Sequence, residues 1–290
     1  MKTYLLISHL RVQNANAMSC PYTIGFPAMT AWLGAVHALQ RSVQQNGMEK
    51  VAMPKAAVSC HDCNLHTYRE KRYSFQSVIG TANPLNKNGE RPSFIPEARC
   101  RLEVSLLVEV TGVSGDNKNE FLDFVEPQLH RMKMAGGDIL SFRKPELLFV
   151  DSDDQSQVRY CVRKLMPGYV LVERRDLVKA AMENGGDAMQ ALLDSIKVSY
   201  EGDTDDDGNT KWRAKKAPGW IVPIAVGFHG ISELGKASNQ RDETQEHRFA
   251  ESIVTLGEFK MPYRFQSPDE MMWHYSPELE QNLYVCKNQE

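Results

Sequence analysis

The sequence predicts an α+β fold, and three observations support this class. The chain has 290 residues, of which 42% are hydrophobic, enough to bury a core in one large domain or two smaller ones. Short apolar runs rich in β-forming residues recur along it. Two further segments carry apolar residues at helical spacing. We therefore expect an α+β core over residues 1–150 and a mixed α/β region over residues 151–290 that packs on this core.

The first half of the core contains the clearest elements. A buried strand is predicted over residues 4–13, a short apolar run. Pro27 suits the first turn of a helix, and apolar residues at helical spacing continue to Val43. A second strand is predicted over residues 55–66. Residues 101–110 alternate between apolar and largely polar side chains, which predicts a strand with one buried face.

The second half of the core completes a recognisable order. A helix is predicted over residues 121–132, which Pro127 must start late or kink, and a short strand over residues 147–150. The order strand, helix, strand, strand, helix, strand is the ferredoxin-like, RRM-like pattern. A long insert, residues 68–100, separates the second and third strands and is rich in Asn, Pro, Gly and basic residues. We expect an exposed hairpin or extended lobe there.

Beyond residue 150 the pattern is less regular. Residues 166–178 predict a strand followed by a helix, and residues 201–210 predict a turn-rich acidic loop. Residues 218–229 predict the edge of a sheet, because prolines interrupt the run. Residues 242–257 are interpreted as a helix. We find no internal repeats.

Charge is unevenly distributed. Net charge is −3 overall, but residues 1–100 carry +6, residues 101–180 carry −1 and residues 181–290 carry −8. A basic first third can meet a phosphate backbone, and an acidic last third is expected to face protein or water. No run approaches the length of a membrane helix, and no secretory signal is recognised at the start. We expect a cytoplasmic protein whose six cysteines are reduced.

Motifs of metal or covalent chemistry are incomplete. Cys60 and Cys63, with His66 close by, form half a zinc site, but no second pair is visible and in a regular strand the two thiols would face opposite sides. Residues 203–208 begin like a calcium loop whose closing acidic ligand is replaced by Ala214. Nucleophile, Walker and dinucleotide motifs are absent. We expect no metal and no cofactor.

The polar run QNANAMS, residues 13–19, is the most informative stretch. It is expected to lie between the first strand and the first helix. Asn and Gln side chains both donate and accept hydrogen bonds, which suits unpaired base edges and sugar hydroxyls. The alternative is a loop whose amides satisfy its own backbone. Gly136 and Gly137 allow two interpretations as well, a tight turn or a close approach of backbone to a ligand. No histidine is paired with a fixed partner in the sequence.

Several blocks together resemble a known family, the second Csy subunit of type I-F CRISPR surveillance complexes, which belongs to the Cas-five group of RAMP proteins. They span nearly the whole chain in the same order. The blocks are Gln13–Ala17, Gly25–Pro27, Gly34–Arg41, Asn83–Asn86, Leu102–Leu107, Ala135–Leu140, Leu165–Gly168, Pro218–Pro223 and Asp242–Thr244.

The resemblance implies a ferredoxin-like RAMP core with an inserted thumb, residues 68–100. It implies a non-catalytic subunit that binds the 5′ handle of the CRISPR RNA, forms a tight heterodimer with the large Csy subunit, abuts the backbone Csy subunit and meets target DNA only through the complex. The residues expected to bind RNA are Arg11, Gln13, Asn14, Asn16, Ser19, Arg41, Arg69, Lys71, Arg72, Gly136 and Gly137. Two alternatives stay open: a metal-independent endoribonuclease that processes repeat RNA, and an assembly scaffold without RNA contact.

Overall fold

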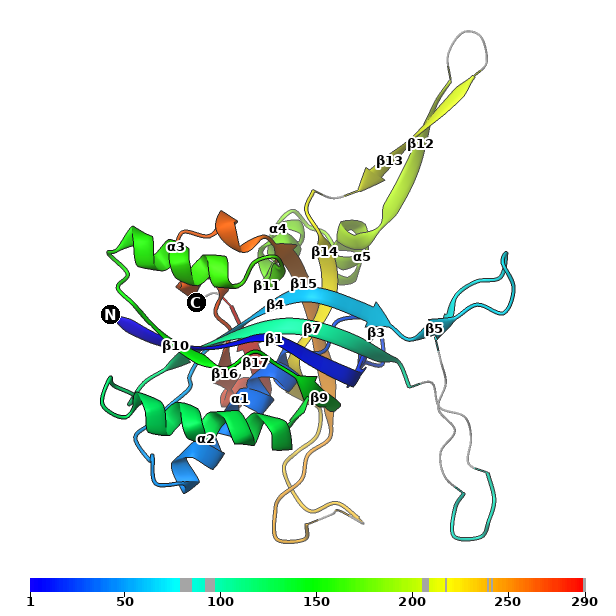
Figure 1. The fold of residues 1–290 in the computed structure, drawn as a ribbon. Helices are drawn as coiled ribbons and strands as arrows, with labels where there is room; N and C mark the ends of the chain where they lie inside the picture. The colour runs from blue at the N-terminus through cyan, green and yellow to red at the C-terminus, as the bar shows by residue number, and fades with distance from the viewer. Residues whose placement is uncertain are drawn as a thin grey trace.

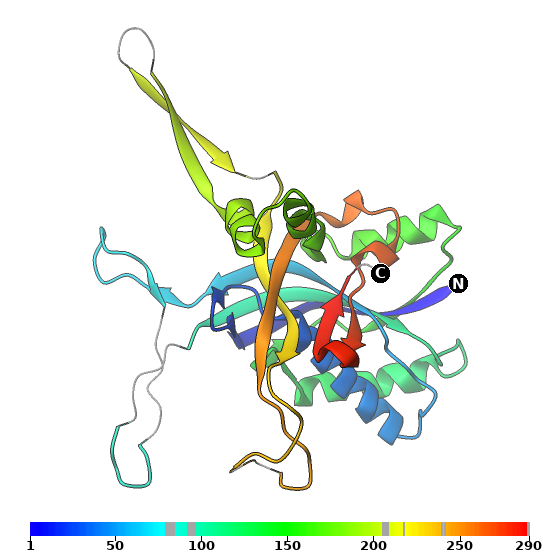
Figure 2. The ribbon, with the colours of Figure 1, turned by 180° about the vertical axis from the view of Figure 1, so that it is seen from behind.

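The computed structural model describes residues 1–78, 85–91, 97–204, 209–216, 218–238, 240 and 242–288, and the structural statements below concern these residues. Eleven strands of this part form one sheet, in which β16, β17, β14, β15, β11, β4, β7, β1, β9 and β8 follow one another and β10 also pairs with β1. Every pairing in the sheet is antiparallel. Figure 1 shows the sheet with its helices, and Figure 2 shows it from behind.

The strands are β1 Lys2–Asn16, β2 Met18–Cys20, β3 Thr23–Ile24, β4 Ala56–Leu65, β5 Thr67–Tyr68, β6 Ser77–Val78, β7 Arg99–Val110, β8 Lys133–Met134, β9 Gly137–Ser141, β10 Glu146–Val150, β11 Tyr169–Glu173, β12 Val198–Thr204, β13 Thr210–Lys216, β14 Ile221–Gly230, β15 Ala250–Lys260, β16 His274–Glu278 and β17 Leu283–Lys287. The α-helices are α1 Met29–Gln45, α2 Lys118–Arg131, α3 Gln155–Lys164, α4 Arg175–Glu183 and α5 Ala188–Ile196. Short 3-10 helices are η1 Pro262–Arg264, η2 Pro268–Met271 and η3 Leu279–Gln281.

Helices α1 and α2 cover one face of the sheet and bury the main hydrophobic cluster (Figure 1). Their apolar stripes, which include Trp32 and Phe121, pack on the inward residues of β1, β4 and β7. The six elements predicted for the core are all present. Because α2 begins at Lys118, Pro127 lies inside it, so of the two expected alternatives, a late start or a kink, the late start is wrong.

On the opposite face of the core strands β1, β4 and β7, α3 covers one end. There α3 packs Val158 and Val162 on a second cluster that includes Tyr4 and Leu107. Further along β1, β7 and β4 this face carries polar and charged side chains, many of them exposed. It is this uncovered part of the sheet that positions the candidate site.

The sheet continues beyond residue 150, because β11 pairs with β4 on one side and β15 on the other. The predicted strand and helix of residues 166–178 are confirmed as β11 and α4. The buried Trp273, between η2 and β16, donates a hydrogen bond from Nε1 to the carbonyl of Leu171, 2.8 Å away, and so links this segment directly to β11. The predicted edge strand is β14. Because it pairs with β15 on one side and with β17 on the other, it is not an edge strand over its whole length, but Pro223 falls where only β15 pairs with it.

Three expectations differ from the structure. Residues 242–257 do not form a helix, because β15 begins at Ala250 and its β-branched run, Ile253 to Thr255, pairs with β14. The acidic loop is shorter than expected, since residues 198–204 and 210–216 form a projecting two-stranded ribbon, β12–β13. Residues 205–208, 79–84 and 92–96 lie outside the described residues, so the thumb is described only in part, with a small β5–β6 pair at its base.

Among the described residues no helix is long and apolar enough to cross a membrane.

Candidate nucleic-acid interface

The open part of the sheet presents side chains from three neighbouring strands. On β1, Val12 belongs to the main core cluster, so Arg11 and Gln13 on either side of it point to the opposite face, where both are exposed. By the same alternation, Arg101 and Glu103 of β7 lie on that face. Their partners Asn64 and Asp62 on β4 complete it. The polar half of the strand pattern seen in the sequence is therefore a surface that no helix in the described part of the chain covers.

The charges of this face are paired with one another. Arg11 Nε lies 3.1 Å from Glu103 Oε2, and Arg101 Nη2 lies 3.6 Å from Asp62 Oδ2. Both arginine side chains are 62% exposed. Exposed pairs of this kind contribute only about 0–1 kcal/mol, so a phosphate can replace the carboxylate at little cost. The carboxylates therefore orient Arg11 and Arg101 but leave both guanidinium groups able to bind a phosphate.

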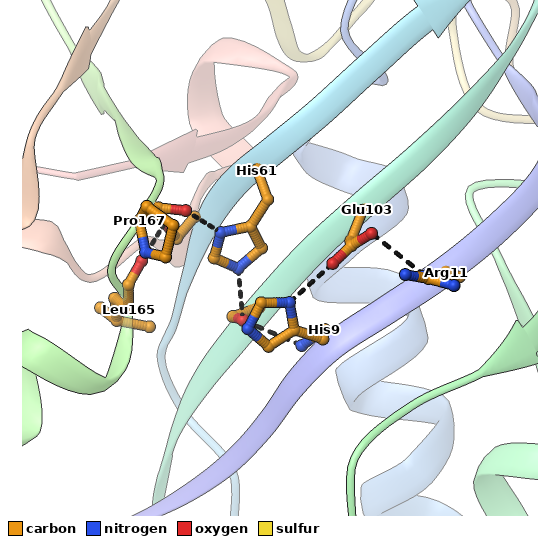
Figure 3. Close-up of polar contacts among 8 residues, drawn as sticks. His9, Arg11, His61, Glu103, Leu165 and Pro167 are labelled. Carbon is orange, nitrogen blue, oxygen red and sulfur yellow. Dashed lines mark hydrogen bonds and ion pairs between the residues drawn. The ribbon is translucent and has the colours of Figure 1, made fainter.

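Two stacked histidines lie beside this surface (Figure 3). The rings of His9 and His61 are 4.6 Å apart and nearly parallel. His9 Nδ1 is 2.6 Å from Glu103 Oε1, and this hydrogen bond, followed by that of Arg11, holds the pKa of Glu103 below its usual range. Glu103 therefore stays ionised and orients both the imidazole of His9 and the guanidinium of Arg11.

His61 is fixed from both of its ring nitrogens. Nδ1 bonds the carbonyl oxygen of Pro167, which only accepts, so Nδ1 carries the proton. Nε2 then accepts from the hydroxyl of Ser105, 2.6 Å away. Burial lowers the pKa of His61, which favours this neutral form. Gly168 makes the arrangement possible, since a Cβ there would lie 2.8 Å from His61 Nδ1.

The amide-rich stretch lies partly inside β1 rather than between a strand and a helix, which corrects the sequence-based expectation. Ala15 is fully buried, and the strand continues to Asn16. Gln13 and Asn14 are exposed, and Asn14 adopts φ +57° at a bulge of the strand. Asn16 bonds its neighbourhood through both amide atoms, to Met18 O at 3.2 Å and from Met18 N at 3.1 Å. For Asn16 the structure therefore shows the self-satisfied arrangement.

Gly136 and Gly137 meet this end of β1. Gly137 pairs through β9, and a Cβ on it would lie 2.5 Å from the carbonyl oxygen of Gln13. Arg99 Nη1 donates to the carbonyl of Asn14 at 3.4 Å and is the nearest atom to the Cβ position of Gly136. The structure thus brings the two glycines together with Gln13, Asn14 and Arg99. The close approach of β1 requires a glycine at position 137 whether or not a ligand binds there.

The other expected residues lie elsewhere. Arg41 is exposed on α1, on the opposite side of the sheet from Arg11. Ser19 is half-buried and donates to the carbonyl of Phe26 at 2.7 Å. The thumb cations Arg69, Lys71 and Arg72 are exposed beyond the end of β5, where the Arg72 guanidinium lies over the ring of Tyr73. They are separate from the sheet surface.

Sequence reasoning did not place His9, His61 or Glu103 in the candidate site. A signal was present, because Glu103 and Ser105 belong to the polar half of the alternating strand 101–110. What the sequence does not reveal is the register that places Ser105 and Glu103 against His9 and His61. A register shift of β4 between Cys60 and Asp62 places Cys60 opposite Val104 and Cys63 opposite Leu102. Both thiols therefore lie on one side of the sheet, and their expected opposite orientation is wrong.

The fold and this surface define a mixed α+β protein with a large antiparallel sheet whose polar, arginine-bearing part is left open. Residues 5–286 match the sequence model of the family described as CRISPR-associated protein (Cas_Csy2). The chain is also 33% identical, over 310 aligned positions covering 97% of it and 93% of the relative, to the CRISPR-associated protein Csy2 of Pseudomonas aeruginosa (strain UCBPP-PA14). The chain belongs to the Csy2 family of CRISPR-associated proteins.

Proposed function

We propose that this chain is a non-catalytic, guide-RNA-binding subunit of a type I-F CRISPR surveillance complex and holds the 5′ handle of the CRISPR RNA against its open sheet face. Family membership supports the CRISPR assignment. The observation that carries the RNA assignment is the uncovered face itself, on which Arg11, Arg101, Gln13 and Asn64 offer guanidinium and amide groups. Such groups suit the phosphates and unpaired base edges of a single strand.

The strand order supports a ferredoxin-like RAMP core within the larger sheet. The four core strands lie in the order β10, β1, β7, β4, all antiparallel, and α1 and α2 lie together on one face. In an RRM-like protein the other face of such a sheet receives RNA.

The same proposal includes protein partners: the large Csy subunit as a tight heterodimer and the backbone Csy subunit. Target DNA then meets the chain indirectly, and the complex acts in the cytoplasm. In support, α4 has no buried residue, and exposure of the side chains Met182, Met189 and Leu193 of α4 and α5 lies between 47% and 64%. Trp212 on the ribbon β12–β13 is 70% exposed. Large apolar side chains that stay exposed on these elements favour a protein partner.

The test compares Arg11→Gln with Arg41→Gln, which remove the same charge from opposite sides of the sheet. The expected result is a loss of about tenfold in affinity for a handle-bearing RNA for Arg11→Gln and little change for Arg41→Gln. The slope of log K against log salt should fall by about 0.7 for Arg11→Gln, as for one lost phosphate contact. Equal losses in both variants would show that RNA does not use the open face.

The thumb is tested separately. Replacing Arg69, Lys71 and Arg72 together by Ala is expected to weaken handle binding and to flatten its salt dependence. A titration series in rising salt measures both. Affinity and slope equal to those of the parent protein would remove the thumb from the binding surface.

One observation favours the endoribonuclease as a second candidate. His9 is held by Glu103 through Nδ1, and its Nε2 makes no hydrogen bond within the described part of the chain, as a general base for a 2′-hydroxyl requires. Purified protein incubated with repeat RNA in EDTA decides between the two. Site-specific cleavage that His9→Ala abolishes would replace the non-catalytic assignment.

A further inference from the structure

A cavity outside the open face lies between α3 and the segment 263–266. Its volume is about 480 Å³, which falls in the range of small-molecule sites. Val158 and Val162, both buried in the second core cluster, line its floor. Tyr263, which is 60% exposed, and Phe265, which packs on the same cluster, line one wall. The cavity therefore has a rigid apolar base and an aromatic side.

Two arginines border this cavity from one turn of α3. Arg159 and Arg163 are both exposed and stand at i and i+4, a spacing at which like charges destabilise a helix. Within the described residues neither guanidinium has an acidic partner, while the nearby carboxylates are used elsewhere: Glu146 binds Lys164, and Asp269 binds Lys2. An unneutralised pair of this kind favours an anion.

The two ends of the cavity differ in their polar side chains. Gln155 and Gln266 add two amide side chains, which can donate to and accept from a base edge. Gln155 lies at the amino-terminal end of α3, next to the acidic residues Asp153 and Asp154, and Arg163 lies at the other end. A phosphate therefore fits at the Arg163 end, and a base fits toward the amides.

A row of neighbouring cavities extends from this cavity toward β1. A second cavity of about 410 Å³ is lined by Ser8, next to His9, together with Arg143, Lys144 and Lys164. A third, of about 620 Å³, shares Glu146 with the second and Arg163 with the first. Consecutive cavities thus lead from Ser8 past α3 to Tyr263, as a flexible strand would run. The continuity favours a nucleic-acid strand over a folded acidic protein.

We propose that the cavity bordered by Arg159, Arg163 and Tyr263 is a second binding site for a nucleotide of single-stranded nucleic acid. Its phosphate lies on the two arginines, and its base lies against Tyr263 and Phe265. The strand is either a continuation of the guide or a separate strand, and the chemistry is shared. This site extends the proposed function, and it is tested so that either assignment can fail alone.

The experiment measures binding of a fluorescein-labelled oligouridylate of about eight nucleotides to the full chain by polarisation, within the roughly 4–16 nucleotide site size of such surfaces. Arg159→Gln with Arg163→Gln is expected to lower affinity at least tenfold and to reduce the salt slope by about 1.4, as for two phosphates. Tyr263→Ala is expected to lower affinity about tenfold through lost stacking. The matched control is Lys50→Gln with Arg131→Gln, which removes two exposed cations, one just after α1 and one at the end of α2.

Further arms separate the possible results. A 4-thiouridine oligonucleotide should crosslink to Tyr263 or Phe265, and comparison with the deoxy oligomer shows whether an RNA or a DNA strand is preferred. Equal affinity of the α3 variants and the control variant, or crosslinks confined to residues 9–16, would overturn the second site while leaving the open face intact. Displacement by polyglutamate without any nucleic-acid crosslink at Tyr263 would identify an acidic protein ligand and also overturn it. Loss of handle binding in the α3 variants alone, with Arg11→Gln unaffected, would sustain this site and remove the open-face proposal.

Discussion

Substituting Gly137 by Ala tests whether this glycine serves the fold or the RNA. A Cβ at this position would lie 2.5 Å from Gln13 O and 2.7 Å from Ala15 N. Both atoms belong to the backbone of β1, which cannot rotate away as a side chain can. Overpacking costs about 1–3 kcal/mol, and a backbone neighbour places Gly137→Ala near the upper value, about 3 kcal/mol.

Gly136 provides the comparison and Gly115 the control. At Gly136 the nearest atom to a new Cβ is 4.0 Å away, but φ is +76°, so Ala costs only the left-handed conformation, about 1–2 kcal/mol. At Gly115 a Cβ meets nothing within 4 Å, and the substitution should be neutral or slightly stabilising.

These energies convert to measurable shifts in Tm. Unfolding entropy of about 2.1 cal/mol/K per residue gives about 0.6 kcal/mol/K for a chain of 290 residues. Gly137→Ala should therefore lower Tm by about 5 °C and Gly136→Ala by about 2–3 °C. Differential scanning calorimetry of the full chain, with handle-RNA affinity measured in parallel, gives both quantities. If Gly137→Ala has the same Tm as Gly115→Ala but binds RNA more weakly, Gly137 serves a close approach to RNA and the packing argument is refuted.

Two further predictions concern His61 and Trp273. Because burial lowers the pKa of His61 in the folded protein, the unfolded chain binds the proton more readily, so stability is full above the ordinary histidine pKa of about 6.5 and falls as pH drops below it. Melting curves between about pH 7.5 and 5.5 should show that Tm falls less steeply with decreasing pH for His61→Gln than for His37→Gln, which replaces an exposed histidine of α1. Equal slopes of Tm against pH would contradict the burial of His61. Trp273→Phe leaves the buried carbonyl of Leu171 without its donor, at a cost of about 1–3 kcal/mol in urea unfolding. A cost near zero there would mean that this hydrogen bond does not hold the segment between η2 and β16 against β11.

Local patterns predict correctly those strands whose alternate residues pack on the main hydrophobic cluster along their whole length. The strand 101–110 was recognised because its apolar positions, from Leu102 to Val110, all face the same core, and β7 runs through the sheet without changing that alternation. The strand β15 was misinterpreted because Phe249, Ile253 and Leu256 also fit a helical spacing. Long-range pairing with β11 and β14 decides its structure, and no local window contains that information.

The candidate site was harder to predict for a related reason. Predicting which side chains share a face of a strand assumes an unbroken period of two. In β1 the residues facing the main core are Leu5 and Ile7, then Leu10 and Val12, so the period shifts by one at His9. Without that shift Leu10 would face the open side and Arg11 the core. The sequence shows the residues of the site but not the irregularity that exposes them.

The irregularities of β1 and β4 depend on one another through β7. β4 shifts its register between Cys60 and Asp62, beside the shift of β1 at His9, while β7 between them stays regular. The two shifts meet at Ser105, whose fully buried hydroxyl accepts the backbone N–H of His9 at 3.1 Å and donates to His61 Nε2 at 2.6 Å. Bulges of this kind re-aim side chains next to functional sites. Since Ser105 is fully buried, it acts on the open face only by holding both bulges, and the exposure of Arg11 depends on a hydroxyl that is not itself at the surface.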